Sequence, residues 1–136
     1  MDKQLALYIS AAPEMDAECE LLGQMLAQLP PAVRWELRRT PRSAVHGNPN
    51  LDALRASALY LILLGADIVA PMGVEWMAAQ QARATTFAYR SGRAVPSPAA
   101  SAFARNAGGT WTLFASPMEL RQQFEVACRA ADLSAA

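Results

Sequence analysis

The chain has 136 residues, of which 53% are apolar, enough for one domain with a buried core and too few for two comfortable ones. Its twelve basic and twelve acidic side chains cancel, and no basic run or stripe stands out. We therefore expect neither nucleic acid nor a membrane surface as a partner.

No apolar stretch approaches the roughly 20 residues that span a bilayer. Residues 1–4 lead straight into a strand-like segment, without the apolar core and cleavage site of a signal peptide. These two features predict a cytoplasmic protein.

Residues that bind metals are few. Cys19 and Cys128 fall in predicted helices without CxxC spacing, and the single histidine, His46, falls in a predicted loop. The chain also lacks a Walker loop, a GxGxxG turn after its first strand and a nucleophile elbow. We expect no metal and no cofactor, and we interpret the cysteines as reduced core residues.

The first half of the chain alternates strand and helix patterns. Residues 5–10 form a short apolar strand, and a helix starts at Pro13, with acidic residues in its first turn, and runs to about Leu29. Residues 33–38 alternate apolar and polar side chains, which indicates a strand at a sheet edge. Residues 40–50 are rich in Gly, Pro and Asn and predict a long loop.

The most apolar run of the chain follows. Asn50 caps a short predicted helix at 51–57, which leads into a strand at 58–65. This strand is apolar throughout, so we expect both its faces to be covered, as in a central parallel strand. After a loop at 66–72, a helix that carries Glu75 in its first turn ends near Arg83.

The last third of the chain repeats the alternation. Strands are predicted at 85–89 and 111–115, from their β-branched and aromatic residues. Between them, residues 91–109 hold one weak helix at about 97–105. A final helix starts with Ser116 as N-cap, followed by proline at its first position and an acid at its third.

This alternation predicts an α/β fold in one domain spanning residues 1–136. Right-handed crossovers give a three-layer sandwich with a five-stranded parallel sheet in the flavodoxin-like order 2-1-3-4-5. The connections leave strands 1 and 3 in opposite directions, so a crevice is expected at their carboxyl ends. The loops at residues 10–13 and 65–72 line this predicted crevice.

Glu75 is the candidate catalytic residue, because its helix starts close to the crevice. The alternative is that a first-turn acid serves only the helix dipole, worth about 0.3–1 kcal/mol. Trp76 beside it is a candidate stacking platform for a base, or a packing residue. The candidate ligand-binding residues are Ser10, Ala11, Gly65, Asp67 and Trp76.

Several segments of the chain together resemble TIR-like domains of bacterial signalling and defence proteins. They are the strand at residues 7–10, an acidic helix, the strand at 58–65 and the segment 73–79, followed by 85–89. The resemblance covers roughly residues 5–133. It implies self-association or binding of a protein partner. In TIR domains that cleave NAD, a glutamate after the third strand assists breakage of the nicotinamide–ribose bond, and Glu75 falls about there.

Nucleoside deoxyribosyltransferases share this layout and use a glutamate nucleophile from a similar helix. Their Asp-Gly at the end of the third strand is replaced here by Leu64-Gly65, with Asp67 as a displaced substitute. The first loop also lacks the charged residues that TIR domains often carry there. These departures favour a binding module and not an enzyme.

We therefore expect a TIR-like signalling or adaptor module that self-associates or binds a partner, with NAD or another nucleotide as the candidate ligand of the crevice. The alternative is an NAD glycohydrolase in which Glu75 stabilises an oxocarbenium ion. In that mechanism Ser10 and the loop at Gly65 approach the ribose or phosphates, and Trp76 packs on a base. A nucleoside-processing transferase is a third hypothesis.

Overall fold

The computed structural model describes residues 3–29, 33–41, 50–108 and 110–130. Much of the loop predicted at residues 40–50, including His46, lies outside the described residues. Among the described residues, no helix is long and apolar enough to cross a membrane.

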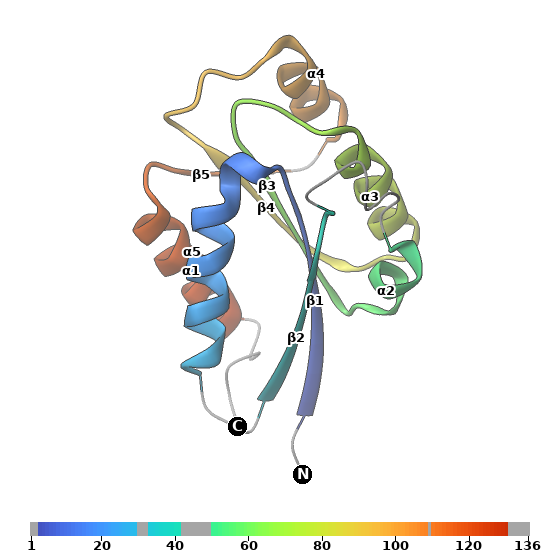
Figure 1. Ribbon diagram of the computed structural model, residues 1–136, viewed down its shortest axis with the longest axis vertical. Coiled ribbons are helices and arrows are strands. Elements are labelled where there is room, and N and C mark those ends of the chain that lie inside the picture. The colour runs from blue at the N-terminus through green and yellow to red at the C-terminus, as the bar shows by residue number, and fades with distance from the viewer. Residues whose placement is uncertain (1–2, 30–32, 42–49, 109, 131–136) are drawn as a thin grey trace.

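Five parallel strands form one sheet in the order β2-β1-β3-β4-β5 (Figure 1). This is the flavodoxin-like order predicted from the alternation of strands and helices, which is therefore confirmed. The strands are β1 Lys3–Ala11, β2 Val33–Arg39, β3 Leu59–Leu64, β4 Thr85–Ser91 and β5 Thr112–Phe114.

Helices cover both faces of the sheet and complete the predicted three-layer sandwich. In Figure 1, α1 and α5 lie on one side of the strands and α2 and α3 on the other, while α4 sits at the carboxyl end. The helices are η1 Pro13–Met15, α1 Asp16–Ala27, α2 Leu51–Ala56, α3 Ala70–Gln81, α4 Pro98–Asn106 and α5 Pro117–Ala130.

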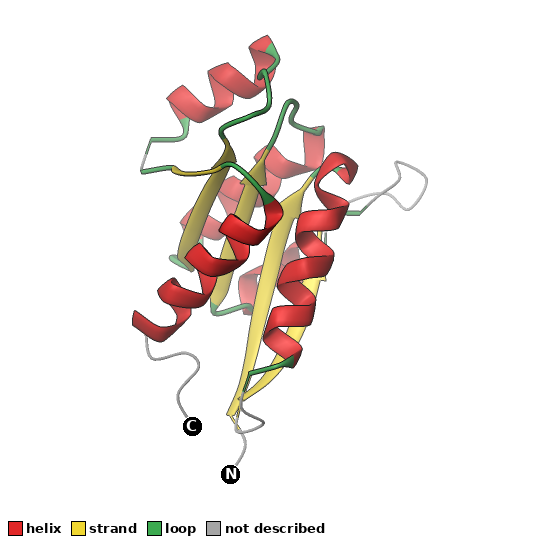
Figure 2. Ribbon diagram, turned by 90° about the vertical axis from the view of Figure 1, so that its left-hand side faces the viewer, coloured by secondary structure: helices red, strands yellow, loops and turns green. Residues whose placement is uncertain are grey.

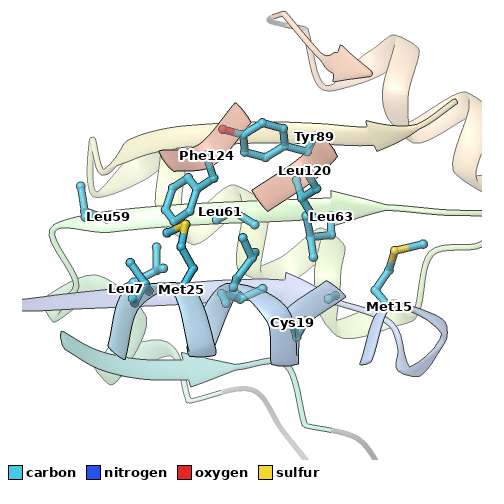
Figure 3. Packing of buried hydrophobic residues seen from close by; sticks show 14 of the residues in the cluster. Leu7, Met15, Cys19, Met25, Leu59, Leu61, Leu63, Tyr89, Leu120 and Phe124 are labelled. Atoms are coloured by element: carbon cyan, nitrogen blue, oxygen red, sulfur yellow. The ribbon is translucent and has the colours of Figure 1, made fainter. Parts of the chain in front are cut away.

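The two faces of β1 carry different side chains. Leu7 and Ile9 point to the layer of α1 and α5, where they join the larger core cluster together with residues of β3 (Figure 3). Figure 2 views this layer from its outer side, with its helices in front of the strands. Tyr8 instead joins the cluster on the α2 and α3 face. The two-residue period of the strand therefore sends Tyr8 and Ser10 towards α3.

Strand positions agree with their sequence patterns. Every residue of β3 is buried, as expected for a central parallel strand, and β2 is an edge strand, as its alternation predicted. Both cysteines are buried, Cys19 on α1 and Cys128 on α5, and these two helices pack on the same sheet face.

Helix starts follow local capping rules. The side chain of Asn50 accepts a hydrogen bond from Ala53 N at the start of α2, and Ser97 caps α4 in the same way. At the start of α5, Glu119 N donates to Ser116 Oγ, while Glu119 Oε1 accepts from Ala115 N, the residue before the N-cap.

Candidate functional site

Glu75 lies on the inner face of α3 and not at its start. The helix begins at Ala70, with Pro71 in its first positions, so Glu75 falls in the second turn and no acidic residue lies in the first. The predicted first-turn placement, and with it the helix-dipole interpretation, is therefore wrong. Met72, Glu75 and Ala79 recur at three and four residues, which turns all three towards the sheet, and each is fully buried.

The Glu75 carboxylate is surrounded by hydroxyl groups. Ser10 Oγ donates to Oε1 over 2.8 Å, and Thr40 Oγ1 donates to the same oxygen over 2.5 Å. Tyr8 OH donates to Oε2. Tyr8 and Ser10 come from β1, and Thr40 directly follows β2. These hydrogen bonds hold α3 against β1 and the end of β2, close to the carboxyl ends of both strands.

A second layer of hydrogen bonds orients these donors. Tyr60 OH, from β3, donates to Ser10 Oγ over 2.7 Å. Thr40 Oγ1 accepts from Ala11 N over 3.1 Å, and Thr40 N donates to Ile9 O over 3.0 Å. Buried polar groups are stable only when they have hydrogen-bond partners, and each hydroxyl around the carboxylate has at least one.

Burial sets the proton affinities of this network. Desolvation raises the pKa of Glu75 above its ordinary value of 4.5, an effect opposed by the three hydroxyl donors and by the positive charge of Arg39. Desolvation also raises the pKa values of Tyr8 and Tyr60, and the neighbouring Glu75 adds to both shifts. Both phenols therefore keep their protons at neutral pH and remain hydrogen-bond donors.

η1 packs against the end of β3, at one wall of the predicted crevice. A Cβ atom added at Gly65 would overlap Met15 Cε and lie 2.9 Å from Glu14 Oε1, so the ends of these two flexible side chains would have to shift. Glu14 Oε1 also accepts a hydrogen bond from Asp67 N over 2.9 Å. Glu14 and Met15 thus lie against the loop after β3, one of the two loops predicted to line the crevice.

The predicted ligand-binding residues separate into different environments. Ser10 contacts Glu75 directly, whereas the amide of Ala11 is engaged by Thr40. Asp67 is exposed, and its Oδ1 accepts from Ser97 Oγ and from Ile68 N, both over 2.8 Å. These hydrogen bonds lower the pKa of the Asp67 carboxyl, the one from Ser97 most.

Trp76 lies in an aromatic cluster that borders the hydroxyl network through Tyr60. Its ring stacks on Trp111 at a centroid distance of 6.0 Å and meets Phe103 and Tyr60 edge-on at 5.9 and 6.2 Å. It also lines two surface grooves, of about 230 Å³ against β4 and about 460 Å³ between α3 and α4. Trp76 is thus a packing residue that also forms part of the surface.

Thr40, Tyr8 and Tyr60 were not among the predicted site residues. Period two along β1 places Tyr8 and Ser10 on one face, a signal that the sequence does contain. Thr40 had no such signal, because its role depends on β2 lying beside β1. Within the described part of the chain, no group of three or more potential ligands surrounds a metal position.

A comparison of the sequence with known protein families and with characterised proteins gives no match.

Proposed function

We propose that the chain is a TIR-like signalling or adaptor module, which acts by binding another copy of itself or a protein partner through the outer face of α3. One observation carries this proposal. On the inner face of this helix the Glu75 carboxylate is enclosed and fully hydrogen-bonded, while on the outer face Val74 and Met77 are 49% and 61% exposed.

The composition of the outer face supports binding. Val74 and Met77 border the groove of about 460 Å³ between α3 and α4, whose wall includes Trp76 and Phe103. Aromatic residues and methionine are enriched in protein interfaces, and clustered exposed apolar groups mark binding surfaces more often than isolated ones do. The balanced charge of the chain adds no long-range repulsion between copies.

Light scattering after size exclusion, over a range of protein concentrations, tests this proposal. The wild-type mass should rise with concentration, and Met77→Glu should weaken association at least about tenfold, because it places a charge in the apolar contact. Val95→Glu is the matched control, since Val95 is 84% exposed and does not line the groove. A wild-type protein that stays monomeric at every concentration would reject self-association.

The alternative function is NAD glycohydrolysis, and the position of the hydroxyl network supports this hypothesis. Ser10 and the Glu75 carboxylate, whose pKa is raised, meet near the carboxyl end of β1, where sheets of this order bind ligands. In this mechanism Glu75 stabilises the oxocarbenium ion, and Trp76 packs on a base. The mechanism requires the hydroxyls of Ser10, Thr40 and Tyr8 to give way to the substrate ribose.

Release of nicotinamide from NAD distinguishes the two functions. If the protein is a glycohydrolase, turnover should be lost in Glu75→Gln and kept in Arg38→Ala, whose side chain is exposed on β2. Circular dichroism on Glu75→Gln separates loss of chemistry from loss of fold. No turnover by the assembled wild-type protein would reject the enzyme.

A further inference from the structure

The outer face of α3 has a ridge and a groove side by side. Val74 and Met77 lie three residues apart on one side of the helix, so they form a ridge. Next to it, the groove between α3 and α4 includes the small residues Ala70, Gly73 and Ala107. A Cβ atom built at Gly73 meets nothing within 4 Å, so the groove is open at this point.

Charge is absent from this face. Glu75 is the only charged residue of α3, and it points inwards, so the exposed side of a 12-residue helix carries none. Among the described residues, none that lines the α3–α4 groove is charged. Arg105 on α4 is exposed but does not line the groove. In a two-fold contact residue i of one copy meets residue j of the other, and only residues at the axis meet their own counterparts. A groove lining without charge lets this surface meet a second copy of itself without repulsion.

The groove wall and the ridge differ in stiffness, which suits a tight contact. Trp76 is held by Trp111, Phe103 and Tyr60, so the groove wall is rigid before binding. Met77 is flexible and exposed, and methionine adapts to the shape of its surroundings.

We propose that this face binds the same face of a second copy about a two-fold axis, with the Met77 side chain of each copy entering the α3–α4 groove of the other. The ridge and groove on one surface are self-complementary, which gives a closed dimer and not an open chain. This assignment rests on the proposed association through α3 and names its partner and symmetry.

The other exposed apolar patch, formed by Leu113 on β5 and Val126 on α5, fits a second copy less well. Val126 is 64% exposed, but Glu125 and Arg129 form an ion pair on the same helix. A two-fold contact there would have to accommodate these charges twice. Val126 therefore provides a matched control position.

Disulfide trapping in the full chain tests the proposal. Both native cysteines are buried, so an introduced cysteine is the only exposed thiol. In the proposed contact, position 77 of one copy lies in the groove that contains position 73 of the other. We therefore expect an equal mixture of Gly73→Cys and Met77→Cys to form covalent dimers under mild oxidation, with a yield at least about tenfold above that of Val126→Cys. Gly73 tolerates the change because the space beside it is open.

Light scattering on the reduced wild-type protein separates the two levels of the proposal. A dimer mass that does not grow further, with trapping at 73 and 77, supports the two-fold contact. Association with trapping at 126 alone, or a mass that keeps growing with concentration, overturns the two-fold contact but leaves self-association standing. A monomer at all concentrations overturns both.

Discussion

Ser10 and Glu75 are 65 positions apart in the chain, and yet Ser10 Oγ donates a hydrogen bond of 2.8 Å to Glu75 Oε1. Thr40 donates to the same oxygen from the end of a third segment. A buried carboxylate is stable only when such donors replace water. The position of α3 on the sheet therefore depends on these hydroxyls, whether or not the carboxylate also has a chemical role.

Replacing Glu75 should show how much stability this network contributes. Glu75→Ala leaves three buried hydroxyl donors without their acceptor, so we expect the free energy of unfolding to fall by about 2–4 kcal/mol. Glu75→Gln keeps one carbonyl oxygen and the side-chain volume, and should lose about 1 kcal/mol. Urea unfolding measures both. Equal stability of Glu75→Ala and the wild-type protein would contradict the structural role.

The raised pKa of Glu75 predicts a pH dependence with a definite sign. Between its ordinary value of 4.5 and its higher value in the folded state, the folded protein binds more protons than the unfolded chain. The contribution of Glu75 to stability is therefore fully present below the ordinary value and is lost as pH rises through the folded value. Relative to Glu75→Gln, the wild-type protein should be more stable at pH 4 than at pH 7.

Urea unfolding of the wild-type protein and of Glu75→Gln between pH 4 and pH 7 measures the difference in their free energies of unfolding. The other carboxyl groups contribute equally to both proteins and cancel in this difference. A difference that is constant with pH, or that grows in favour of the wild-type protein as pH rises, would contradict a raised pKa.

Two tyrosines of the network should differ in their contribution. Tyr8 OH donates to the carboxylate of Glu75, whereas Tyr60 OH donates to the neutral hydroxyl of Ser10. Hydrogen bonds to charged groups are the stronger kind, so we expect Tyr8→Phe to cost about 1.5–3 kcal/mol and Tyr60→Phe about 0.5–1.5 kcal/mol. Tyr8→Phe should also raise the pKa of Glu75 further, because it removes a donor that stabilises the ionised form.

Thermal and urea unfolding of the two variants provide the comparison, since both remove one oxygen from a fully buried ring. If Tyr60→Phe were the more destabilising change, the carboxylate would not be the dominant acceptor of the network.

The strand order was predictable because it depends on local patterns. Residues 58–65 are apolar throughout, which fixes a central strand, while the alternation in β2 fixes an edge. Helix patterns between the strands require parallel pairing with crossovers on both faces. Helix caps such as Asn50 and Ser116 were equally visible, because they involve neighbours within three residues.

The site was less predictable, because its contacts join distant segments. The sequence singled out Glu75 and Ser10 but gave no means of pairing either with Thr40. The start of α3 was placed too late, although Pro71 is typical of a first helical position. If the helix had been predicted to start near Pro71, the spacing of Met72, Glu75 and Ala79 would have placed the carboxylate on the face towards the sheet. The packing of η1 against the end of β3 depends on side-chain contacts that no local pattern indicates.

Two glycine substitutions should have opposite effects, although the chemical change is the same. Gly65→Ala pushes the flexible ends of Met15 and Glu14 aside, so we expect a loss of about 1 kcal/mol, the low end for overpacking. Gly73→Ala meets open space in the interior of α3 and improves its helix propensity, so we expect a gain of about 0.5–1 kcal/mol. Urea unfolding measures both changes. Hydrogen exchange gives a second readout, because displacement of Glu14 should speed exchange at the amide of Asp67 in Gly65→Ala alone. If Gly65→Ala were neutral and the exchange of the Asp67 amide unchanged, η1 would not be packed on the end of β3.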